Sequence, residues 1–406
     1  MTNVGETSVP ASTGPVEAQR AHTTLVLEHL VDHGPTTRSE LAHATGLGRG
    51  AIAGLTARLI DAGVLRPAES DPTGDGRATP LSLAAADRVL VTAFIGTDEA
   101  IATVASLSGE ELARFTMPIP VGSPLDALGA VLARALARAD RSEHPIAEIS
   151  VLVDGIVAGA PSVVITDARL GPEPVDVLGE LRARVPALAE VEPGLLLPLT
   201  LEPVAVAAAA AEHAGLGVAD VLYLSGDTAV AAAIVAGGAP LLGAHGLAAT
   251  FGHLPVVEGG VRCECGQRGC LATVASAEVV LERAELADFA ATHGRGAALE
   301  ELVTRIEAAD DRARWSWLDA ALWIGRALQL VVPTVDPAVV VVGGYWSRLI
   351  TDIDTAYRAN RPTIGGGALE SIPVIAAARL GSDAALVGAR RQARQRLVAE
   401  PLLLAG

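Results

Sequence analysis

Two segments that lie far apart in this chain repeat one pattern of short β-rich runs. RVLVTAFIG, AIATVASLSG and ELARFTMPI follow one another from residue 88, with turn residues between them. DVLYLSGDTAVAAAIVAGGAPLLG, residues 220–243, again has the pattern strand, Gly-containing turn, strand. Each segment is followed by helical stretches and a further apolar run, AEISVLVDGIV in the first case and AVVVVGG in the second. A meander that recurs with helices between its copies predicts two related α/β lobes.

Residues 19–83 have a different, mainly helical pattern. Apolar residues at helical spacing end at Gly34-Pro35, and Thr37 with Glu40 forms a capping box that predicts a second helix. A turn at 46–48 leads to a third helix, and GDGRATPLSL, residues 74–83, suggests a β-wing. This order predicts an N-terminal winged helix-turn-helix, preceded by a disordered tail at 1–18. The stripes expected to face its core are Leu25, Val26, Leu30 and Val31, and then Ile52, Leu55 and Leu59.

The composition and the apolar pattern indicate the cellular compartment of the chain. No apolar run reaches the roughly 18 residues of a membrane helix, and the first residues lack the basic and apolar regions of a secretory signal. We therefore expect a cytoplasmic protein, a compartment in which disulfides are rare. The net charge of −17, with arginine as the sole strongly basic residue type, argues against indiscriminate binding to nucleic acid but leaves room for one small DNA-reading module.

All three cysteines lie in GHLPVVEGGVRCECGQRGC, residues 252–270. Cys263, Cys265 and Cys270 with His253 form the ligand set of a closed, structural Zn²⁺ site, and Gly266 and Gly269 suit the turn around a metal. A disulfide would leave one thiol over, and nothing nearby activates a catalytic cysteine. His245 and Glu264 are alternative candidates for the fourth ligand.

The same segment carries a resemblance to a known family. GH, a spacer and CECGQRGCL, followed by Ala275-Ser276, closely resemble the signature of the ROK family of sugar-responsive repressors and sugar kinases. The wing GRATPL, the run PAVVVVGG and the C-terminal LGSDAALVGA match as well, so the resemblance covers nearly the whole chain. It implies an α/β fold in which the winged helix-turn-helix precedes a two-lobed, actin-like and ribonuclease H-like sugar-kinase body. The first lobe would comprise residues 84–198 plus 375–406, and the second, with the zinc loop, residues 199–374.

The residues that serve phosphoryl transfer in the family's kinases are replaced here. The kinase loop D-x-G-G-T is FIGTDEA in this chain, with Phe94 in the place of the acid and Asp98 beyond the turn. The loop G-T-G-I-G-x-G is GDTAVAA, residues 226–232, in which Ala229 and Ala231 add methyl groups where phosphate needs bare backbone. The catalytic Asn-Asp pair is Pro203-Val204, and valine cannot accept a proton. These losses predict that the chain is not an enzyme.

The sugar site that the resemblance implies is altered too. Glu-x-Gly-His of the family is Thr250-Phe251-Gly252-His253 here, and Asn-Leu-Gly is Arg169-Leu170-Gly171. A site for a polyol needs its hydrogen-bond partners, so we expect an effector other than an ordinary hexose, or none. The degenerate effector pocket would consist of Phe94, Arg169, Val204 and Thr250.

The third N-terminal helix carries few groups that could read DNA. Its outward positions are Gly50, Ala53, Gly54, Ala57 and Asp61, which offer no donors to base edges, and residues 1–83 hold six arginines against nine acidic residues. The candidate DNA contacts are Arg38, Arg49, Arg58 and Arg77, of which Arg49 and Arg77 are the candidates for base or groove readout. The alternative for each is an ordinary solvated arginine.

We therefore interpret the chain as a ROK-type transcriptional regulator, a repressor that binds operator DNA as a homodimer or tetramer through an inactive kinase-like body. One alternative is an interaction protein that has lost DNA binding. A divergent sugar kinase is the other, and it would need an acid at position 94 or 204, where Phe94 and Val204 stand.

Overall fold

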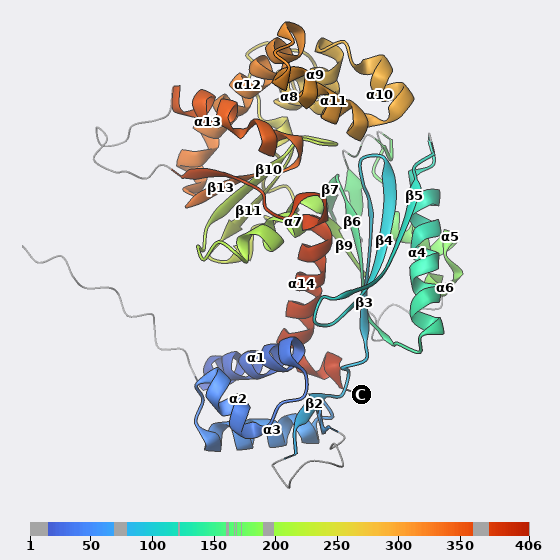
Figure 1. Ribbon diagram of the computed structural model, residues 1–406, viewed down its shortest axis with the longest axis vertical. Helices are drawn as coiled ribbons and strands as arrows, with labels where there is room; N and C mark the ends of the chain where they lie inside the picture. The colour runs from blue at the N-terminus through green and yellow to red at the C-terminus, as the bar shows by residue number, and fades with distance from the viewer. Residues whose placement is uncertain are drawn as a thin grey trace, which may run out of the picture. The chain divides into compact units, whose positions relative to one another are not determined.

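The computed structural model describes residues 15–68, 79–120, 122–159, 162–165, 167, 169–171, 173–189, 199–359 and 373–405 (Figure 1). Contacts within the chain divide it into two units, which are described separately below. Unit 1 takes in Met1–Arg88, Ser106–Glu110 and Ala393–Gly406, and unit 2 takes in Val89–Ala105 and Glu111–Gln392.

Unit 1 begins with three helices and a two-stranded antiparallel sheet, in the order expected from the sequence. The elements are α1 (Pro15–His33), α2 (Arg38–Thr45), α3 (Arg49–Asp61), β1 (Leu65–Pro67) and β2 (Leu81–Leu83). The apolar residues expected to form its core are buried, except that Leu25 is 44 % exposed and Leu27 is buried in its place. Helix α1 starts at Pro15 and so includes residues 15–18, which were expected to belong to a disordered tail.

Local hydrogen bonds set the turn between α2 and α3. Thr37 caps α2 through the amide of Glu40, and the Glu40 carboxylate bonds back to the Thr37 amide, which is the capping box expected from the sequence. Gly46 ends α2 in the left-handed conformation, and Gly48 precedes α3 without a side-chain cap. Nε of Arg38 donates to Oγ1 of Thr56 at 3.0 Å, which ties the first turn of α2 to α3.

The last residues of the chain also belong to unit 1. They form the end of α14 (Ala384–Ala399) and the short helix η5 (Pro401–Leu404). Arg394 pairs with Asp32 of α1 at 2.5 Å, and the guanidinium of Arg88 donates to the carbonyls of Leu403 and Ala405 at 2.7 and 2.6 Å. Residues 375–406 were expected to belong to the first lobe. Because these bonds join the end of the chain to the N-terminal region, residues from 393 onward belong to unit 1 instead.

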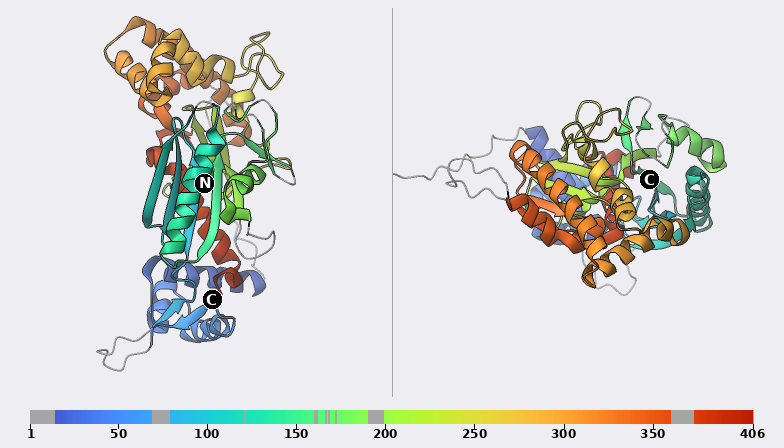
Figure 2. Two further views of the ribbon diagram at one scale, coloured as in Figure 1. Left: turned by 90° about the vertical axis from the view of Figure 1, so that its right-hand side faces the viewer. Right: turned by 90° about the horizontal axis from the view of Figure 1, so that it is seen from above.

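The first lobe of unit 2 is a five-stranded sheet in the order β5-β4-β3-β6-β9. Helix α4 lies along this sheet and buries Leu128, Val131 and Leu132 against it (Figure 2). Strand β9 joins parallel to β6, so the first sheet extends past residue 199, where the second lobe was expected to start. The elements are β3 (Val89–Ile95), β4 (Glu99–Ser106), β5 (Glu111–Pro118), α4 (Pro124–Arg141), β6 (Ile146–Val153), β7 (Ile156–Ala158), β8 (Val163–Ile165), α5 (Val177–Arg184), α6 (Pro186–Ala189) and β9 (Leu199–Pro203).

The second sheet has the same topology, β12-β11-β10-β13-β14. In each sheet the first strand in sequence pairs with the second on one side and with the fourth on the other. This common order confirms the two related α/β lobes expected from the repeated meander. Strand β14 pairs parallel to β13 and lies in the second sheet, although residues from 375 were expected in the first lobe. The strands are β10 (Val221–Ser225), β11 (Ala231–Ala236), β12 (Ala239–Pro240), β13 (Val339–Val342) and β14 (Val374–Ala377).

Helices of the second lobe pack around the 25-residue helix α12. Trp317 of α12 and Trp346 are fully buried there, and Nε1 of Trp317 donates to Asp352 at 2.9 Å. Among the described residues, α12 is the helix that is long and apolar enough to cross a membrane, but 44 % of its most apolar window is buried in this core. The helices are η1 (Phe251–His253), α8 (Ala272–Ala275), α9 (Ala277–Arg283), α10 (Ala287–His293), α11 (Arg295–Glu307), α12 (Asp311–Val335), η2 (Gly344–Leu349) and α13 (Ile350–Ala359).

A core of small residues lies between the two sheets. It joins α7 (Val204–His213), the part of α14 before residue 393, and residues of β3, β6 and β10. The helices α7 and α14 touch so closely that a Cβ on Gly388 would lie 1.7 Å from the carbonyl oxygen of Ala207. The alanine-rich run 205–211 is therefore a packing surface, because larger side chains would force these helices apart.

Candidate functional site

Four side chains with metal-ligating atoms meet in the loop between β12 and α8. Nδ1 of His253 lies 3.6 Å from Sγ of Cys263, and Sγ of Cys265 lies 3.6 Å from Sγ of Cys270. All four ligand atoms lie within 4.8 Å of one another. Tetrahedral zinc with Zn–S bonds near 2.3 Å places sulfurs about 3.8 Å apart. The cluster therefore has the spacing to hold one metal ion, and it includes His253 as the nitrogen ligand.

The backbone of this loop is folded around the cluster. The amide of Cys263 donates to Gln267 at 2.8 Å, and isolated β-bridges join Pro255 to Cys270 and Arg262 to Arg268. Gly269 has a φ of +73°, and a Cβ there would lie 1.7 Å from the carbonyl oxygen of Val257. Glycine is thus required at 269 by both its conformation and its surroundings.

In the absence of a metal ion, the cluster favours a neutral imidazole and a protonated Cys270 thiol. Burial, and then hydrogen bonding to Cys265, raises the pKa of Cys270 to about 12. Burial lowers the pKa of His253 and keeps the imidazole neutral, the form that ligates a metal. Three thiolates this close together repel one another, so a bound divalent cation is what would allow them to ionise.

The positions where the family resemblance implies catalytic groups do not line one common site. Phe94 is 8 % exposed and lies in the apolar core, and Val204, the first residue of α7, packs against the same core. Thr250 precedes η1 in the zinc-ligand region and is half-buried. Phe94 and Val204, expected to form one degenerate pocket with Thr250, are therefore in a packed core, whereas Thr250 lies in the loop of the His253 and cysteine cluster.

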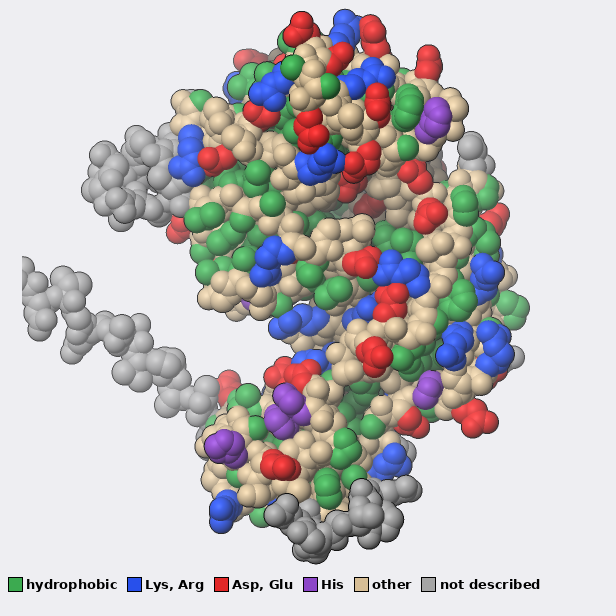
Figure 3. Space-filling view, in the orientation of Figure 1, with side chains coloured by type: hydrophobic (Ala, Val, Ile, Leu, Met, Phe, Trp, Pro, Cys, Tyr) green, Lys and Arg blue, Asp and Glu red, His purple; other side chains and the backbone are tan. Residues whose placement is uncertain are grey.

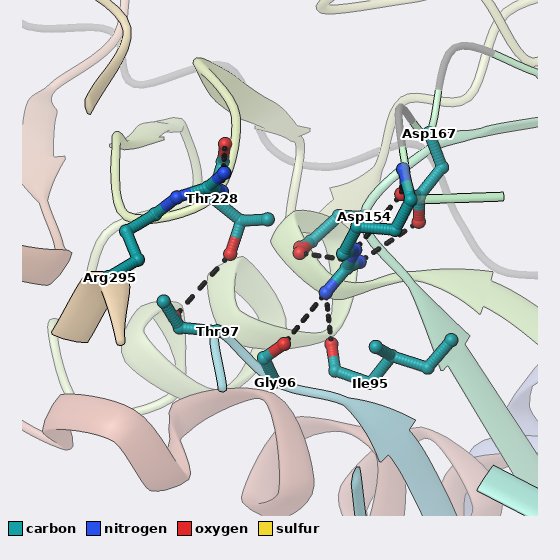
Figure 4. A network of polar contacts seen from close by, with 8 residues as sticks. Ile95, Gly96, Thr97, Asp154, Asp167, Thr228 and Arg295 are labelled. Atoms are coloured by element: carbon teal, nitrogen blue, oxygen red, sulfur yellow. Dashed lines mark hydrogen bonds and ion pairs between the residues drawn. The ribbon is translucent and has the colours of Figure 1, made fainter. Parts of the chain in front are cut away.

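Arg169 is the exception, because it lies in a buried polar network. Its partners Ile95, Gly96, Asp154 and Asp167 are labelled in Figure 4. Its Nη1 donates to the carbonyls of Ile95 and Gly96 at 3.0 and 2.7 Å. Nη2 donates to Asp154 and Asp167, both at 2.9 Å, and Nε donates to Asp167 at 3.0 Å. A guanidinium has five N–H donors, and all five are used by these oxygens. Arg169 consequently has no N–H donor left over for an effector.

The two carboxylates that pair with Arg169 are shielded from water. The side chains of Asp154 and Asp167 are 12 % and 2 % exposed. Burial raises the pKa of Asp154, and the charge of Arg169 opposes that rise. The arginine therefore compensates two carboxylates that would otherwise be costly to bury.

Asp98 has a role that the sequence did not reveal. It follows β3 in the first lobe, and its carboxylate accepts hydrogen bonds from the amides of Arg295 and Gly296 at 2.9 and 2.7 Å. These amides open helix α11 of the second lobe, whose N-cap Gly294 supplies no side-chain bond. Asp98 thus caps a helix 197 residues away in sequence and joins the lobes, a contact that no local pattern signals.

A second carboxylate occupies the loop at 226–232. Asp227 accepts a hydrogen bond from the amide of Tyr345 at 2.7 Å, and burial raises its pKa. Next to it, Oγ1 of Thr228 lies 3.5 Å from Oγ1 of Thr97, and Arg295 donates to the Thr228 carbonyl at 3.3 Å. A loop with a buried acid in it offers a poor environment for phosphate, which is strongly anionic.

The DNA-contact candidates lie at exposed positions of unit 1. Arg38, Arg49 and Arg58 are exposed, and so are all five outward positions of α3 named above. Arg77 lies outside the described residues. In the view of Figure 3, basic side chains over the helices of unit 1 are few and separate. The structure therefore brings no basic cluster together on the described part of that face.

Comparison with known proteins places the fold. The two-lobed body is a sugar-kinase-like α/β fold, shared with a ROK family glucokinase from Streptomyces griseus solved with glucose and AMPPNP. That structure has 25 % sequence identity and a TM-score of 0.60, and the match covers 76 % of this chain and 99 % of the glucokinase. The model of the ROK family matches residues 92–396, so the chain belongs to the ROK family.

Two further relatives differ in what they share with the chain. A glucokinase of Halalkalibacterium halodurans is 30 % identical over 253 residues, which are 58 % of this chain and 74 % of the glucokinase. A solved ROK family transcriptional regulator, described as a homologue of the Escherichia coli MLC protein, has a TM-score of 0.68 at 20 % identity. That match covers 95 % of this chain and 98 % of the regulator, and it shows the likeness of fold.

Arg169→Met is expected to destabilise unit 2 by about 3–5 kcal/mol at pH 8, because it leaves Asp154 and Asp167 buried without their cation. The loss should be smaller at pH 5. A buried carboxyl with a raised pKa takes up a proton more readily in the folded state, so its cost to stability grows as pH rises. Urea unfolding followed by tryptophan fluorescence measures this, since Trp315, Trp317, Trp323 and Trp346 all lie in unit 2.

The matched control is Arg114→Met. Arg114 also bridges two acids, Glu111 and Asp383, but its side chain is 34 % exposed. Its loss should cost about 1 kcal/mol or less. Equal and small effects of both substitutions would show that the Arg169 network does not stabilise the cleft.

Proposed function

We propose that the chain is a DNA-binding transcriptional regulator of the ROK family, a repressor whose kinase-like body carries out no phosphoryl transfer. The observation that carries the proposal is the difference in coverage between the two solved relatives. The glucokinase accounts for 76 % of the chain, whereas the regulator accounts for 95 %. Unit 1, with its three helices and β-ribbon, supplies elements in the order of a winged helix-turn-helix.

The residues at the positions of the kinase groups support the proposed lack of phosphoryl transfer. Apolar Phe94 and Val204 stand where an acid and a base are needed, and Arg169 is committed to the chain's own oxygens. Asp227 adds a buried acid in the second loop. A sugar kinase needs a base, a metal-holding acid and a phosphate cradle, and none of these groups is supplied at the matching positions. A divergent kinase is therefore the weaker candidate, although named relatives such as the glucokinase are kinases.

In this function α3 would enter the major groove and the arginines would contact phosphates. Arg49 begins α3, where the helix N-terminus also favours an anionic phosphate, and Arg58 lies in its last turn. Operator DNA would be bound by a homodimer or tetramer in the cytoplasm, and an effector, if one binds, is not an ordinary hexose. The competing function, an interaction protein without DNA binding, is favoured by the outer face of α3, whose side chains offer no hydrogen-bond donors to base edges.

DNA binding should be steeply salt-dependent and weakly selective. In a gel-shift series with the duplex upstream of its own gene, each phosphate contact adds about 0.9 to the slope of log affinity against log salt. Arg58→Ala should weaken all duplexes alike and reduce that slope by about 1. Arg77→Ala should weaken A·T-rich duplexes most, because a narrow minor groove attracts arginine.

The control for these variants is Arg141→Ala, at the end of α4 in unit 2, which should leave DNA binding unchanged. No retention of any duplex at low salt would reject the regulator and support the interaction protein. Discrimination of one operator by many thousandfold would contradict the weak selectivity inferred from the surface of α3.

No ATP-dependent phosphorylation of glucose or N-acetylmannosamine is expected. A coupled assay of purified protein measures this, with a ROK glucokinase assayed in parallel as the positive control. Turnover above background with either sugar would overturn the proposal of an inactive body.

We further propose that His253, Cys263, Cys265 and Cys270 hold one structural Zn²⁺ per chain. Bound zinc would fix the loop by linking its four ligands and would leave no open position for chemistry. Cys265→Ser should lower both the zinc content and the melting temperature, because the binding energy of a structural metal contributes to folding. Elemental analysis and thermal melting measure the two effects.

His245→Ala and Glu264→Gln are the matched controls, since both residues lie in the same loop but outside the cluster. Both variants should retain zinc. A wild-type protein that is fully stable without metal would refute the site.

A further inference from the structure

Two histidine side chains lie together at the end of α1. His29 and His33 are four residues apart, and their rings stack with the centroids 4.2 Å apart and an angle of 17° between the planes. Residues at this spacing share one face of a helix. Histidine side chains are visible at the surface of unit 1 in Figure 3, and of this pair His29 is half-buried and His33 is exposed. Two imidazoles four residues apart on one helical face are an arrangement that can hold a metal ion.

A hydrogen bond orients one of the two rings. Nδ1 of His33 donates to the carbonyl oxygen of His29 at 3.1 Å. A histidine that ligates a metal commonly donates its other ring N–H to a carbonyl or a carboxylate, because this bond fixes the tautomer and the direction of the ring. The bond therefore makes Nε2 of His33 the unprotonated nitrogen, which is the atom that ligates a metal.

The separation of the rings fits a shared ion. Bonds from zinc to imidazole nitrogens are about 2.0–2.1 Å long, so two such nitrogens on one metal lie about 3 Å apart. The torsion about the Cβ–Cγ bond of histidine is soft. Rotation of the His29 ring about this bond can thus bring one of its nitrogens toward Nε2 of His33, while the hydrogen bond of His33 is kept.

The surroundings of the pair favour a positive charge. His33 is the last residue of α1, where the helix dipole presents its negative end. The carboxylates of Asp32 and Glu40, from α1 and α2, act on His29 and would attract a cation. Burial, and then the charge of His33, nevertheless lower the pKa of His29 overall. At neutral pH its imidazole is therefore uncharged, which is the form that binds a metal.

We propose that His29 and His33 bind one divalent transition-metal ion that prefers nitrogen ligands, of which Ni²⁺ is an example. Asp32 pairs with Arg394, and Glu40 bonds to the cap of α2, so both carboxylates are engaged and water would complete the coordination. With open positions and an exposed ligand the ion would exchange readily, in contrast to one held by the four ligands of the cysteine cluster. Bound at the last turn of α1, it would stabilise the end of that helix.

The chain contains a matched control for this geometry. Phe289 and His293 of α10 also stack at 4.2 Å, with 23° between their planes, and Nδ1 of His293 donates to the Phe289 carbonyl at 3.2 Å. This pair repeats the arrangement with one imidazole, so it has the stacking without the second ligand. His29→Phe converts the pair of α1 into the same phenylalanine–histidine stack, and thus removes a ligand while it keeps a ring in place.

Calorimetric titration of the full chain with Ni²⁺ tests the proposal, after incubation with one equivalent of Zn²⁺ to fill the cysteine cluster. The wild type should bind one Ni²⁺ with a dissociation constant below about 0.1 mM. His29→Phe and His33→Ala should each raise that constant at least about 10-fold, because a single imidazole loses the advantage of two linked ligands. His293→Phe is the control and should leave the constant unchanged.

A second measurement uses the wild type and so does not depend on the stability of a variant. Octahedral Ni²⁺ is paramagnetic, so in NMR spectra of protein with ¹³C-labelled histidine rings, substoichiometric Ni²⁺ should broaden the signals of His29 and His33 first. Binding weaker than about 0.1 mM, binding that His29→Phe leaves unchanged, or first broadening at His253 would overturn the site. The site does not depend on DNA binding: a protein that binds Ni²⁺ here and retains no duplex would reject the regulator alone.

Discussion

Five hydrogen bonds from one buried guanidinium determine what the kinase-like body can do. Arg169 joins the end of β3, the turn after β6 and Asp167 by donating to the oxygens of all three. Taking a charge out of water costs several kcal/mol, so a buried arginine persists only where every donor is satisfied. That satisfaction fixes three segments of the first lobe to one another and uses up the groups that would otherwise meet a ligand. Asp98 and Thr228 then join the lobes across the same region.

In the proposed function, this body acts as a scaffold and not as a catalyst. What this scaffold presents to other molecules is its surface, which includes the loop of the His253 and cysteine cluster. The family's shared architecture explains why kinase relatives align with the body at 30 % identity while the cleft chemistry differs. A shared fold does not imply a shared activity, because activity depends on particular side chains, and the proposed loss of activity rests on Phe94, Val204 and Asp227.

Local patterns predicted much of this structure from sequence. The capping box at Thr37, the apolar stripe of α3 and the repeated meander each depend on residues close together in the chain, and all three are present. The clustering of the cysteines likewise followed from their spacing. What the sequence did not reveal depends on distant partners. In the sequence Asp98 was an acid beyond the turn with no assigned role, and the structure shows that it caps α11. Arg169 was a departure from the family motif, and the structure shows that it pairs with Asp154 and Asp167. The lobe boundaries at β9 and β14 also depended on pairings that only the assembled sheets specify.

The grouping of residues 393–405 with the N-terminal helices sets an order on biosynthesis. Asp32 and its partner Arg394 are 362 residues apart, so a ribosome working at about 5–20 residues per second releases the second well after the first, by on the order of half a minute. The N-terminal helices are therefore synthesised well before their partners in α14, and closing that long loop must follow the synthesis of α14. A chain truncated before Arg394 would lose the bonds to Arg88 and Asp32. The loss would destabilise the N-terminal helices, at the other end of the sequence. The part of unit 1 that is synthesised first is thus completed only once the end of α14 has been made.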